Sequence, residues 1–282
     1  STVMMSEQQK TDEATLEQMK DISQSIIDSQ PLIADSSSIL GALQEEYQNN
    51  TDSPGFLPGL AYLDKKYARI RRVRGDGNCF YRAALFAYLE NLTMQLSTGD
   101  AAGPVEYDRI LKIIQQSKDD LVNVGYSEFA VEDFHETFLD FFLRVPSLSP
   151  AALFEHFTEG GEADYYTWYM RLLTAGYLRQ HGDRFFPFLA DGMDLDMTSY
   201  CAREVEPMGK ECEQLHIIAL TEYLGLKVSI EYLDGREFNA ASGLSCIQFP
   251  QLDEGVPHTT PLCSFTVNLL YRPGHYDILY NV

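Results

Sequence analysis

The spacing of apolar side chains predicts a chain in which helices come first and strands come late. From residue 80 to residue 224, apolar residues recur mostly every three or four positions, which is the period of an amphipathic helix. In the stretch 131–145, four phenylalanines share one face and Pro146 ends the pattern. Further helices are expected at 80–92, 106–124, 163–181, 198–205 and 213–224, with a loop at 97–104.

Beyond Gly225 the hydrophobic period becomes that of strands. Residues 227–233 form a β-branched run with alternation, and residues 264–271 and 276–280 have the same character. The last two runs are joined by a short Arg-Pro-Gly-His connection, so we expect an antiparallel hairpin. Helices followed by strands predict a mixed α+β domain.

The first 60 residues differ from the rest in composition. They are rich in Gln, Ser and Asp and poor in aromatic residues, so we expect a mobile acidic arm over 1–60 and a folded domain over 61–282, with a linker at 49–59. An amphipathic helix near 16–29 would either pack on its own domain or become ordered on a partner. Its apolar stripe consists of Leu16, Met19, Ile22 and Ile26.

Charge narrows the classes of partner. The 282 residues include 21 Lys and Arg against 42 Asp and Glu, a net charge of −21, while 45% of the residues are hydrophobic. Such a chain can fill a core, but its surface repels nucleic acid and anionic membranes, so neither is expected as a partner. Residues 65–74 are an exception, with six basic residues and no acidic one. We interpret this cluster as a solvated helix face rather than as a patch for an anionic partner.

The five cysteines, at positions 79, 201, 212, 246 and 263, form no CxxC pair and no zinc-binding pattern. They are expected to be free thiols in a reducing compartment, the cytoplasm with the nucleus as a second location. The amino-terminal residues lack the apolar stretch of a signal peptide. No phosphate-binding glycine motif is present, so a nucleotide is not expected.

Cys79 occupies a position that suits a nucleophile. Gly75 and Gly77 favour a tight turn, and Asp76 and Asn78 are residue types that begin helices. A thiol at a helix N-terminus is favoured as the thiolate, and free backbone N–H groups there can hold an oxyanion. Position alone still favours the alternative, a buried packing cysteine, which is the role also expected for the other four.

His275 is the candidate base among six histidines. It follows a Pro-Gly turn, and Asp277 lies two residues on, so both side chains share one face of an extended segment. A carboxylate beside the imidazole can orient the ring and stabilise the imidazolium. The alternative is a turn histidine next to a solvated aspartate. The histidines at 135, 156, 181, 216 and 258 are interpreted as structural or surface residues.

Two segments taken together resemble the otubain family of OTU-type cysteine proteases, in its ubiquitin-aldehyde-binding type. They are Asp-Gly-Asn-Cys-Phe-Tyr-Arg at 76–82 and Tyr-Arg-Pro-Gly-His-Tyr-Asp at 271–277. The resemblance implies a papain-like fold of the α+β class, with a small, mainly antiparallel sheet packed between helical lobes. It also implies isopeptide hydrolysis at the ubiquitin C-terminus, with neither a metal nor another cofactor. The implied roles are nucleophile for Cys79, general base and acid for His275, orientation for Asp277, and support by Asp76 of an oxyanion loop at Gly77 and Asn78.

The same resemblance implies the partners. These are ubiquitin and polyubiquitin, with a preference for chains linked through ubiquitin lysine forty-eight, and E2 enzymes charged with ubiquitin. In the family, an N-terminal helix takes part in a non-catalytic blockade of the charged E2, and the 16–26 stripe is its counterpart here. A monomeric hydrolase and a non-catalytic E2 inhibitor are therefore the two main hypotheses. An inactive interaction module is disfavoured, because the Cys–His–Asp set is intact.

Overall fold

The computed structural model describes residues 24–26, 29–50, 52–158, 161–189, 196–251 and 260–282. Leu16, Met19 and Ile22 of the apolar stripe lie outside these residues, and Ile26 lies within them. The expected helix near 16–29 therefore stays a prediction.

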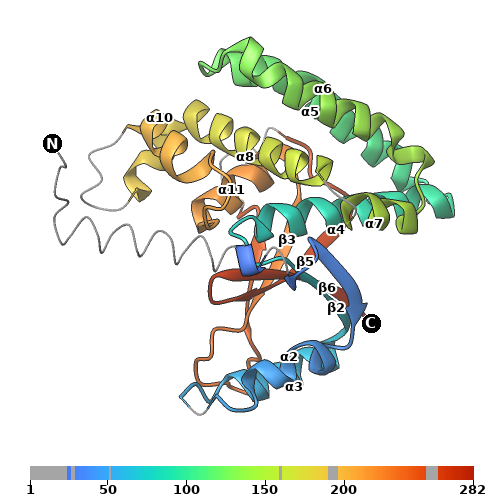
Figure 1. Cartoon of the computed structure of the whole chain (residues 1–282), viewed down its shortest axis with the longest axis vertical. Coiled ribbons are helices and arrows are strands. Elements are labelled where there is room, and N and C mark those ends of the chain that lie inside the picture. The colour runs from blue at the N-terminus through green and yellow to red at the C-terminus, as the bar shows by residue number, and fades with distance from the viewer. Residues whose placement is uncertain (1–23, 27–28, 51, 159–160, 190–195, 252–259) are drawn as a thin grey trace, which may run out of the picture.

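A six-stranded sheet forms the centre of the molecule, in the order β1-β2-β6-β5-β3-β4 (Figure 1). The predicted hairpin is confirmed, because β5 and β6 pair antiparallel from Asn268↔Leu279 to Arg272↔His275. Among the named pairs only β3 and β5 run parallel, so the sheet is mainly antiparallel as expected. The strands are β1 (Ile33–Ser37), β2 (Tyr67–Val73), β3 (Lys227–Tyr232), β4 (Ser245–Phe249), β5 (Thr266–Arg272) and β6 (His275–Asn281).

Helices cover both faces of this sheet, and adjacent apolar residues of one strand serve different faces. Leu269 and Ile278 belong to the core under α4 (Cys79–Thr98), whereas Leu270 and Leu279 belong to a second core under the N-terminal helices. This explains the continuous apolar runs in β5 and β6, since strands buried on both sides do not alternate strictly. The mixed α+β class, with a sheet between helical lobes, is confirmed.

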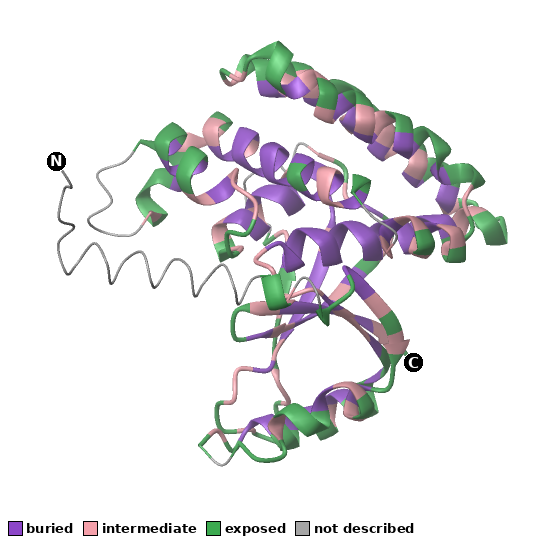
Figure 2. Cartoon of the chain, viewed as in Figure 1, coloured by how far each residue is buried: buried purple, intermediate pink, exposed green. Residues whose placement is uncertain are grey.

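The larger lobe surrounds α4, which is buried on nearly every side, as the purple ribbon in Figure 2 shows. A helix that is apolar all round is expected only where other elements enclose it. Its companions are α5 (Ala102–Asn123), α6 (Glu128–Arg144), α7 (Pro150–Thr158), α8 (Glu162–Gln180), α9 (Gly182–Phe185), α10 (Met197–Tyr200), continued by a π-helical turn over Cys201–Val205, and α11 (Gln214–Leu224).

The smaller lobe shows that the expected arm is part of the fold. The strand β1 pairs with β2, and α2 (Ile39–Tyr47) and α3 (Phe56–Lys66) pack against the sheet through a shared apolar core. The expected boundary at residue 60 falls inside α3, and the expected linker at 49–59 contains the start of this helix. The interpretation as a mobile arm is therefore wrong for residues 33–50 and 52–60, because a few well-placed apolar side chains outweigh a polar average composition.

The basic cluster at 65–74 is not the solvated helix face that was expected. Most of it is strand β2 instead of a helix face, and successive arginines of a strand point to opposite sides. Arg71 reaches Glu90 of α4, whereas Arg72 reaches Glu46 of α2. Lys66, at the end of α3, pairs with the fully buried Glu231. These cations hold the two lobes to the sheet.

Two helix boundaries differ from expectation at the predicted 97–104 loop. The helix α4 continues to Thr98 and α5 begins at Ala102. Gly99 ends α4 in the left-handed conformation, and its N–H points back to the carbonyl groups of Gln95 and Leu96. Among the described residues, no helix combines the length and apolar character needed to cross a bilayer.

Candidate active site

The turn that precedes Cys79 is shaped by contacts that exclude side chains. Gly77 has φ +76°, and a Cβ atom there would lie 2.2 Å from the carbonyl oxygen of Gly209. Only glycine accepts both the conformation and this close approach. Asn78 is the residue before α4, and Cys79 is its first residue, so the thiol lies at the helix N-terminus as expected.

His275 and Asp277 adopt the arrangement expected from their spacing. His275 Nε2 donates to Asp277 Oδ1 at 2.8 Å. The Cys79 side chain lies close enough to the imidazole to raise its pKa. A Cβ atom on Gly75 would lie 3.3 Å from Nδ1, so the backbone at this glycine closes one side of the ring. The structure therefore brings together Cys79, His275 and Asp277 from α4 and β6.

The pKa of His275 reflects two opposing causes. Burial lowers it, but the hydrogen bonds and charges of Asp277 and Cys79 raise the pKa to about 9. At neutral pH the ring is therefore an imidazolium next to the Cys79 sulfur. This is the charge state in which the histidine can stabilise a thiolate and then donate a proton.

Asp277 is fully buried and its two oxygens have different partners. Oδ1 accepts from His275 and from the Val73 N–H at 3.0 Å. Oδ2 accepts from Arg272 Nε at 3.1 Å and Nη2 at 2.9 Å. Burial alone would raise the pKa of this carboxyl group, but His275, Arg272 and Arg72 hold it below the usual value. Asp277 is thus a fixed carboxylate beside His275.

Asp76 lies behind the turn rather than in the cleft. Its carboxylate accepts from Arg82 Nη1 at 3.0 Å and Nη2 at 2.8 Å, and from the Asn78 N–H at 3.0 Å. Burial raises its pKa, but the Arg82 hydrogen bonds and charge outweigh this and lower it. Arg82 is itself fully buried and also binds Asp164. This geometry fits the expected support of the loop at Gly77 and Asn78.

Arg171 is a residue of the site that the sequence reasoning did not single out for a role. It is fully buried, donates to Gly77 O at 2.7 Å, and contacts Asn78 Oδ1 through Nε at 3.0 Å and Nη2 at 2.8 Å. The Gly209 N–H donates to the same oxygen at 2.9 Å. Arg171, on α8, therefore fixes the turn at Gly77 and Asn78. The sequence signal for this role was the presence of an arginine inside the apolar stretch 163–181.

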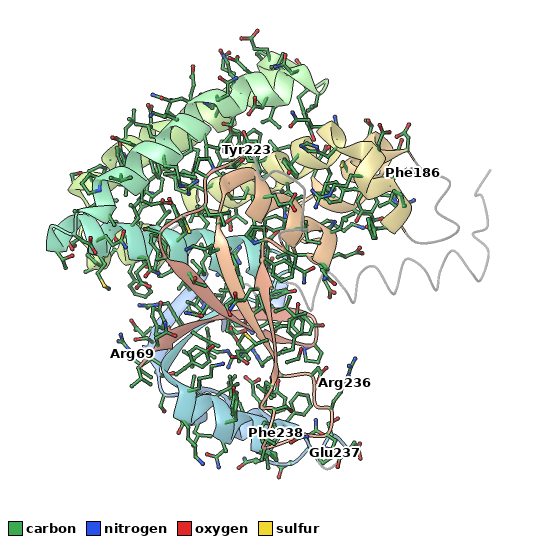
Figure 3. All side chains as sticks on the ribbon, turned by 180° about the vertical axis from the view of Figure 1, so that it is seen from behind. Arg69, Phe186, Tyr223, Arg236, Glu237 and Phe238 are labelled. Carbon is green, nitrogen blue, oxygen red and sulfur yellow. The ribbon has the colours of Figure 1, made fainter. Side chains whose placement is uncertain are left out.

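A cleft of about 480 Å³ opens at Cys79 and has an acidic lining. A second hollow of about 530 Å³ shares Glu213 and Gln214 with it and is bounded by Phe185 and Phe188. In Figure 3, Phe186 and Arg236 are labelled on different parts of the molecule, the first on the helical lobe and the second beside the smaller lobe. The charged residues of the first cleft are Glu211, Glu213, Asp234 and Arg236.

The other cysteines and His216 differ in how far they are buried. Cys201 and Cys263 are buried, as the packing interpretation expects. The interpretation is wrong for Cys246, which is exposed, and incomplete for Cys212, which lines the same cleft as Cys79. His216 is buried, and burial lowers its pKa to about 4. Among the described residues, no group of three or more His, Cys, Asp or Glu is placed to hold a metal ion.

Comparison with known proteins places this geometry in a family. The sequence matches the family Peptidase C65, otubain, over residues 25–281. The chain belongs to the otubain family. This confirms the resemblance carried by the two motifs, and with it the enzyme class of a cysteine peptidase.

Named relatives of this otubain agree with the family match. It is 38% identical over 271 residues to the ubiquitin thioesterase OTUB1 of Homo sapiens, covering 95% of this chain and 90% of the relative. It is 36% identical to the OVARIAN TUMOR DOMAIN-containing deubiquitinating enzyme 1 of Arabidopsis thaliana, over 86% of this chain and 78% of that protein. A solved structure of an OTUB1–ubiquitin aldehyde–UBC13~Ub complex matches with a TM-score of 0.80 and 31% identity, covering 96% of this chain and 98% of the solved chain.

Proposed function

We propose that this otubain is a deubiquitinating cysteine peptidase that hydrolyses the isopeptide bond at the C-terminus of ubiquitin. The observation that carries the proposal is the position of Cys79 at the N-terminus of α4, beside a histidine that Asp277 holds. The named relatives are ubiquitin thioesterases or deubiquitinating enzymes, which supports ubiquitin as the substrate.

In the proposed reaction, Cys79 Sγ attacks the isopeptide carbonyl carbon and the carbonyl oxygen becomes an oxyanion. The backbone N–H groups of Gly77 and Cys79 donate to that oxygen, since the Asn78 N–H between them is held by Asp76. His275 gives its proton to the departing lysine amine as the C–N bond breaks, which leaves a thioester. His275 then takes a proton from water, whose oxygen attacks the thioester, and the ubiquitin carboxylate and the Cys79 thiolate are released.

The charge of the cleft favours the same substrate. Glu211, Glu213 and Asp234 line the space in front of Cys79. The C-terminal tail of ubiquitin is rich in arginine, so acidic walls attract it toward the thiol. Within this proposal we expect chains linked through lysine forty-eight to be cleaved fastest. A panel of diubiquitins of every linkage tests this preference, which equal rates across the panel would contradict.

A ubiquitin probe with an electrophilic C-terminus tests the hydrolase. Wild-type protein should form one covalent adduct, and Cys79→Ala should form none. Cys246→Ala is the matched control, because Cys246 is an exposed thiol outside the cleft and its loss should leave the adduct unchanged. Failure of well-folded wild-type protein to react would overturn the proposal.

A second candidate function is the binding of ubiquitin-charged E2 enzymes without catalysis. It is favoured by the structural match to OTUB1 bound to ubiquitin aldehyde and UBC13~Ub, which extends over 96% of this chain. The proposed contact is the stripe of Leu16, Met19, Ile22 and Ile26.

The deletion that tests this function must stop before Gln30. Gln30 Oε1 accepts from the Gly75 N–H, and the Gln30 carbonyl accepts from Arg74 Nε, so this residue supports the catalytic turn. Removal of residues 1–23 should abolish inhibition of ubiquitin transfer from a charged E2 while leaving the probe adduct intact. Full inhibition after this deletion would reject the role of the stripe.

A further inference from the structure

Two arginines connect the buried Asp277 to Glu46 of α2, in the smaller lobe. Arg272 donates to Asp277 Oδ2 through Nε and Nη2, and its Nη1 donates to Glu46 Oε2 at 2.7 Å. Arg72 Nη1 donates to Glu46 Oε1 at 2.7 Å, and its Nε lies 3.5 Å from Asp277 Oδ2. Each oxygen of Glu46 thus holds one of the two guanidinium groups that face Asp277.

This arrangement leaves one oxygen of Asp277 for the histidine. The arginines occupy the Oδ2 side, so Oδ1 is directed at His275 Nε2 and the Val73 N–H. A bidentate guanidinium fixes the plane of a carboxylate as well as its position. Further contacts keep the arginines themselves in place, because Tyr47 OH accepts from Arg272 Nη1 and Ala42 O accepts from Arg72 Nη1.

The charges of Asp277, Glu46, Arg72 and Arg272 also balance. Asp277 and Glu46 carry two negative charges, and Arg72 and Arg272 carry two positive charges. Without Glu46, the set beside His275 would have a net positive charge, which disfavours an imidazolium. Glu46 is 42% exposed, so water screens part of its effect.

We infer that Glu46 is a positioning residue of the reaction, which acts through Arg272 and Arg72 on Asp277 and so keeps His275 oriented and protonated. The inference rests on the proposed function, since it concerns the same Cys–His–Asp set. Helix α2, which lies within the expected N-terminal arm, thus contributes to the reaction. Among the described residues, the other titratable groups close to His275 are Cys79 of α4 and Glu211, whose carboxylate lies near the adjacent Gly274; Arg74 and Asp76 flank Gly75 in the sequence, and Asp76 is turned toward Arg82.

The pH profile of kcat/KM on ubiquitin with a C-terminal fluorogenic amide provides the first test. Glu46→Gln removes the charge but keeps an oxygen acceptor, so we expect the alkaline limb to move to lower pH by on the order of half a unit. Glu46→Asp keeps the charge and should keep the alkaline limb near its wild-type position. The control is Glu45→Gln, because Glu45 is an exposed neighbour on the same helix and should leave the profile unchanged.

A charge-balanced double variant separates this role from simple docking of α2. Glu46→Gln combined with Arg72→Gln removes one negative and one positive charge, so the alkaline limb should return toward the wild-type pH. A purely structural role predicts the opposite, a loss that deepens with the second substitution. An unchanged limb in Glu46→Gln, or no return in the double variant, would overturn the inference.

An NMR titration of the His275 ring makes the test independent of turnover. The imidazole pKa should fall in Glu46→Gln and recover in the double variant, whether or not ubiquitin is cleaved. Absence of activity and of the probe adduct in wild type would count against the proposed function alone. An unmoved His275 pKa in Glu46→Gln would count against the role of Glu46 alone.

Discussion

The raised pKa of His275 predicts a specific pH dependence of stability. The usual value is 6.5 and the folded value is about 9. Below pH 6.5 the ring is protonated in both the folded and unfolded states, so its contribution is fully present. As the pH rises toward 9, the unfolded chain has lost this proton while the folded protein still holds it, and the stabilisation declines until the folded ring also titrates.

The magnitude follows from the size of the shift. A change from 6.5 to about 9 is about 2.5 pKa units, and each unit is equivalent to about 1.4 kcal/mol. The side chain of His275 is only 14% exposed, so we expect a contribution on the order of 3 kcal/mol. Nearly all of it should disappear between pH 6.5 and pH 9.

The assay compares the free energy of unfolding of wild type and His275→Gln in urea across this pH range. Taking the difference between the two proteins removes the titration of tyrosines and lysines, which both share. The difference should be largest at the acidic end and fall as the pH rises. Parallel curves for the two proteins would refute the reasoning that Asp277 and Cys79 hold the proton on this ring.

His181→Gln supplies the control, because burial and the charge of Arg184 lower the pKa of His181. The sign is then reversed. Both folded and unfolded states are neutral at this site above pH 7, so the difference from wild type should be flat there and change only in more acidic solution.

Three further perturbations test the surroundings of the thiol. Gly77→Ala should lower kcat/KM by about 100-fold, because the Cβ atom would meet Gly209 O and displace the loop. The control is Gly99→Ala, since Gly99 has φ +72° and open space around it. This variant should impose similar backbone strain at the end of α4 and leave the rate nearly unchanged. Arg171→Lys cannot reproduce the forked hydrogen bonds to Gly77 and Asn78. The free energy of unfolding in urea should therefore fall by roughly 3 kcal/mol, and hydrolysis should slow. A variant as stable as wild type would contradict the role of this buried network. Deletion of residues 1–50 should abolish the ubiquitin-probe adduct, since it removes β1, α2 and the Gln30 contacts, whereas deletion of residues 1–23 should not; equal reactivity of the two truncations would show that α2 is dispensable.

Local patterns predicted the site more fully than they predicted the sheet. The glycine turn before Cys79 and the two-residue spacing of His275 and Asp277 are short-range features, so they could be recognised without knowing the tertiary structure. The hairpin of β5 and β6 was predictable for the same reason. Each depends on residues only a few positions apart, where backbone geometry decides the outcome.

The smaller lobe depends on distant contacts and was therefore missed. The strand β1 exists through its pairing with β2, and α2 is held by ion pairs from Arg72 and Arg272, the second of which lies on β5. The basic cluster was misinterpreted because a count of charges shows neither the alternation along β2 nor the distant acidic partners of Lys66, Arg71 and Arg72. The role of Arg171 was equally hidden, since its partners at Gly77 and Asn78 lie more than 90 positions away.

The order of the strands affects how the nascent chain matures. The strand that carries His275 and Asp277 comes last of the named strands along the chain, yet it lies inside the sheet between β2 and β5. Cys79 leaves the ribosome about 200 residues before this strand, which corresponds to roughly 10 to 40 s of synthesis. During that interval β2 lacks its inner neighbour and Cys79 lacks His275. Completion of the sheet and the meeting of Cys79 with His275 are therefore one event, so under the proposed mechanism a partly made chain is inert.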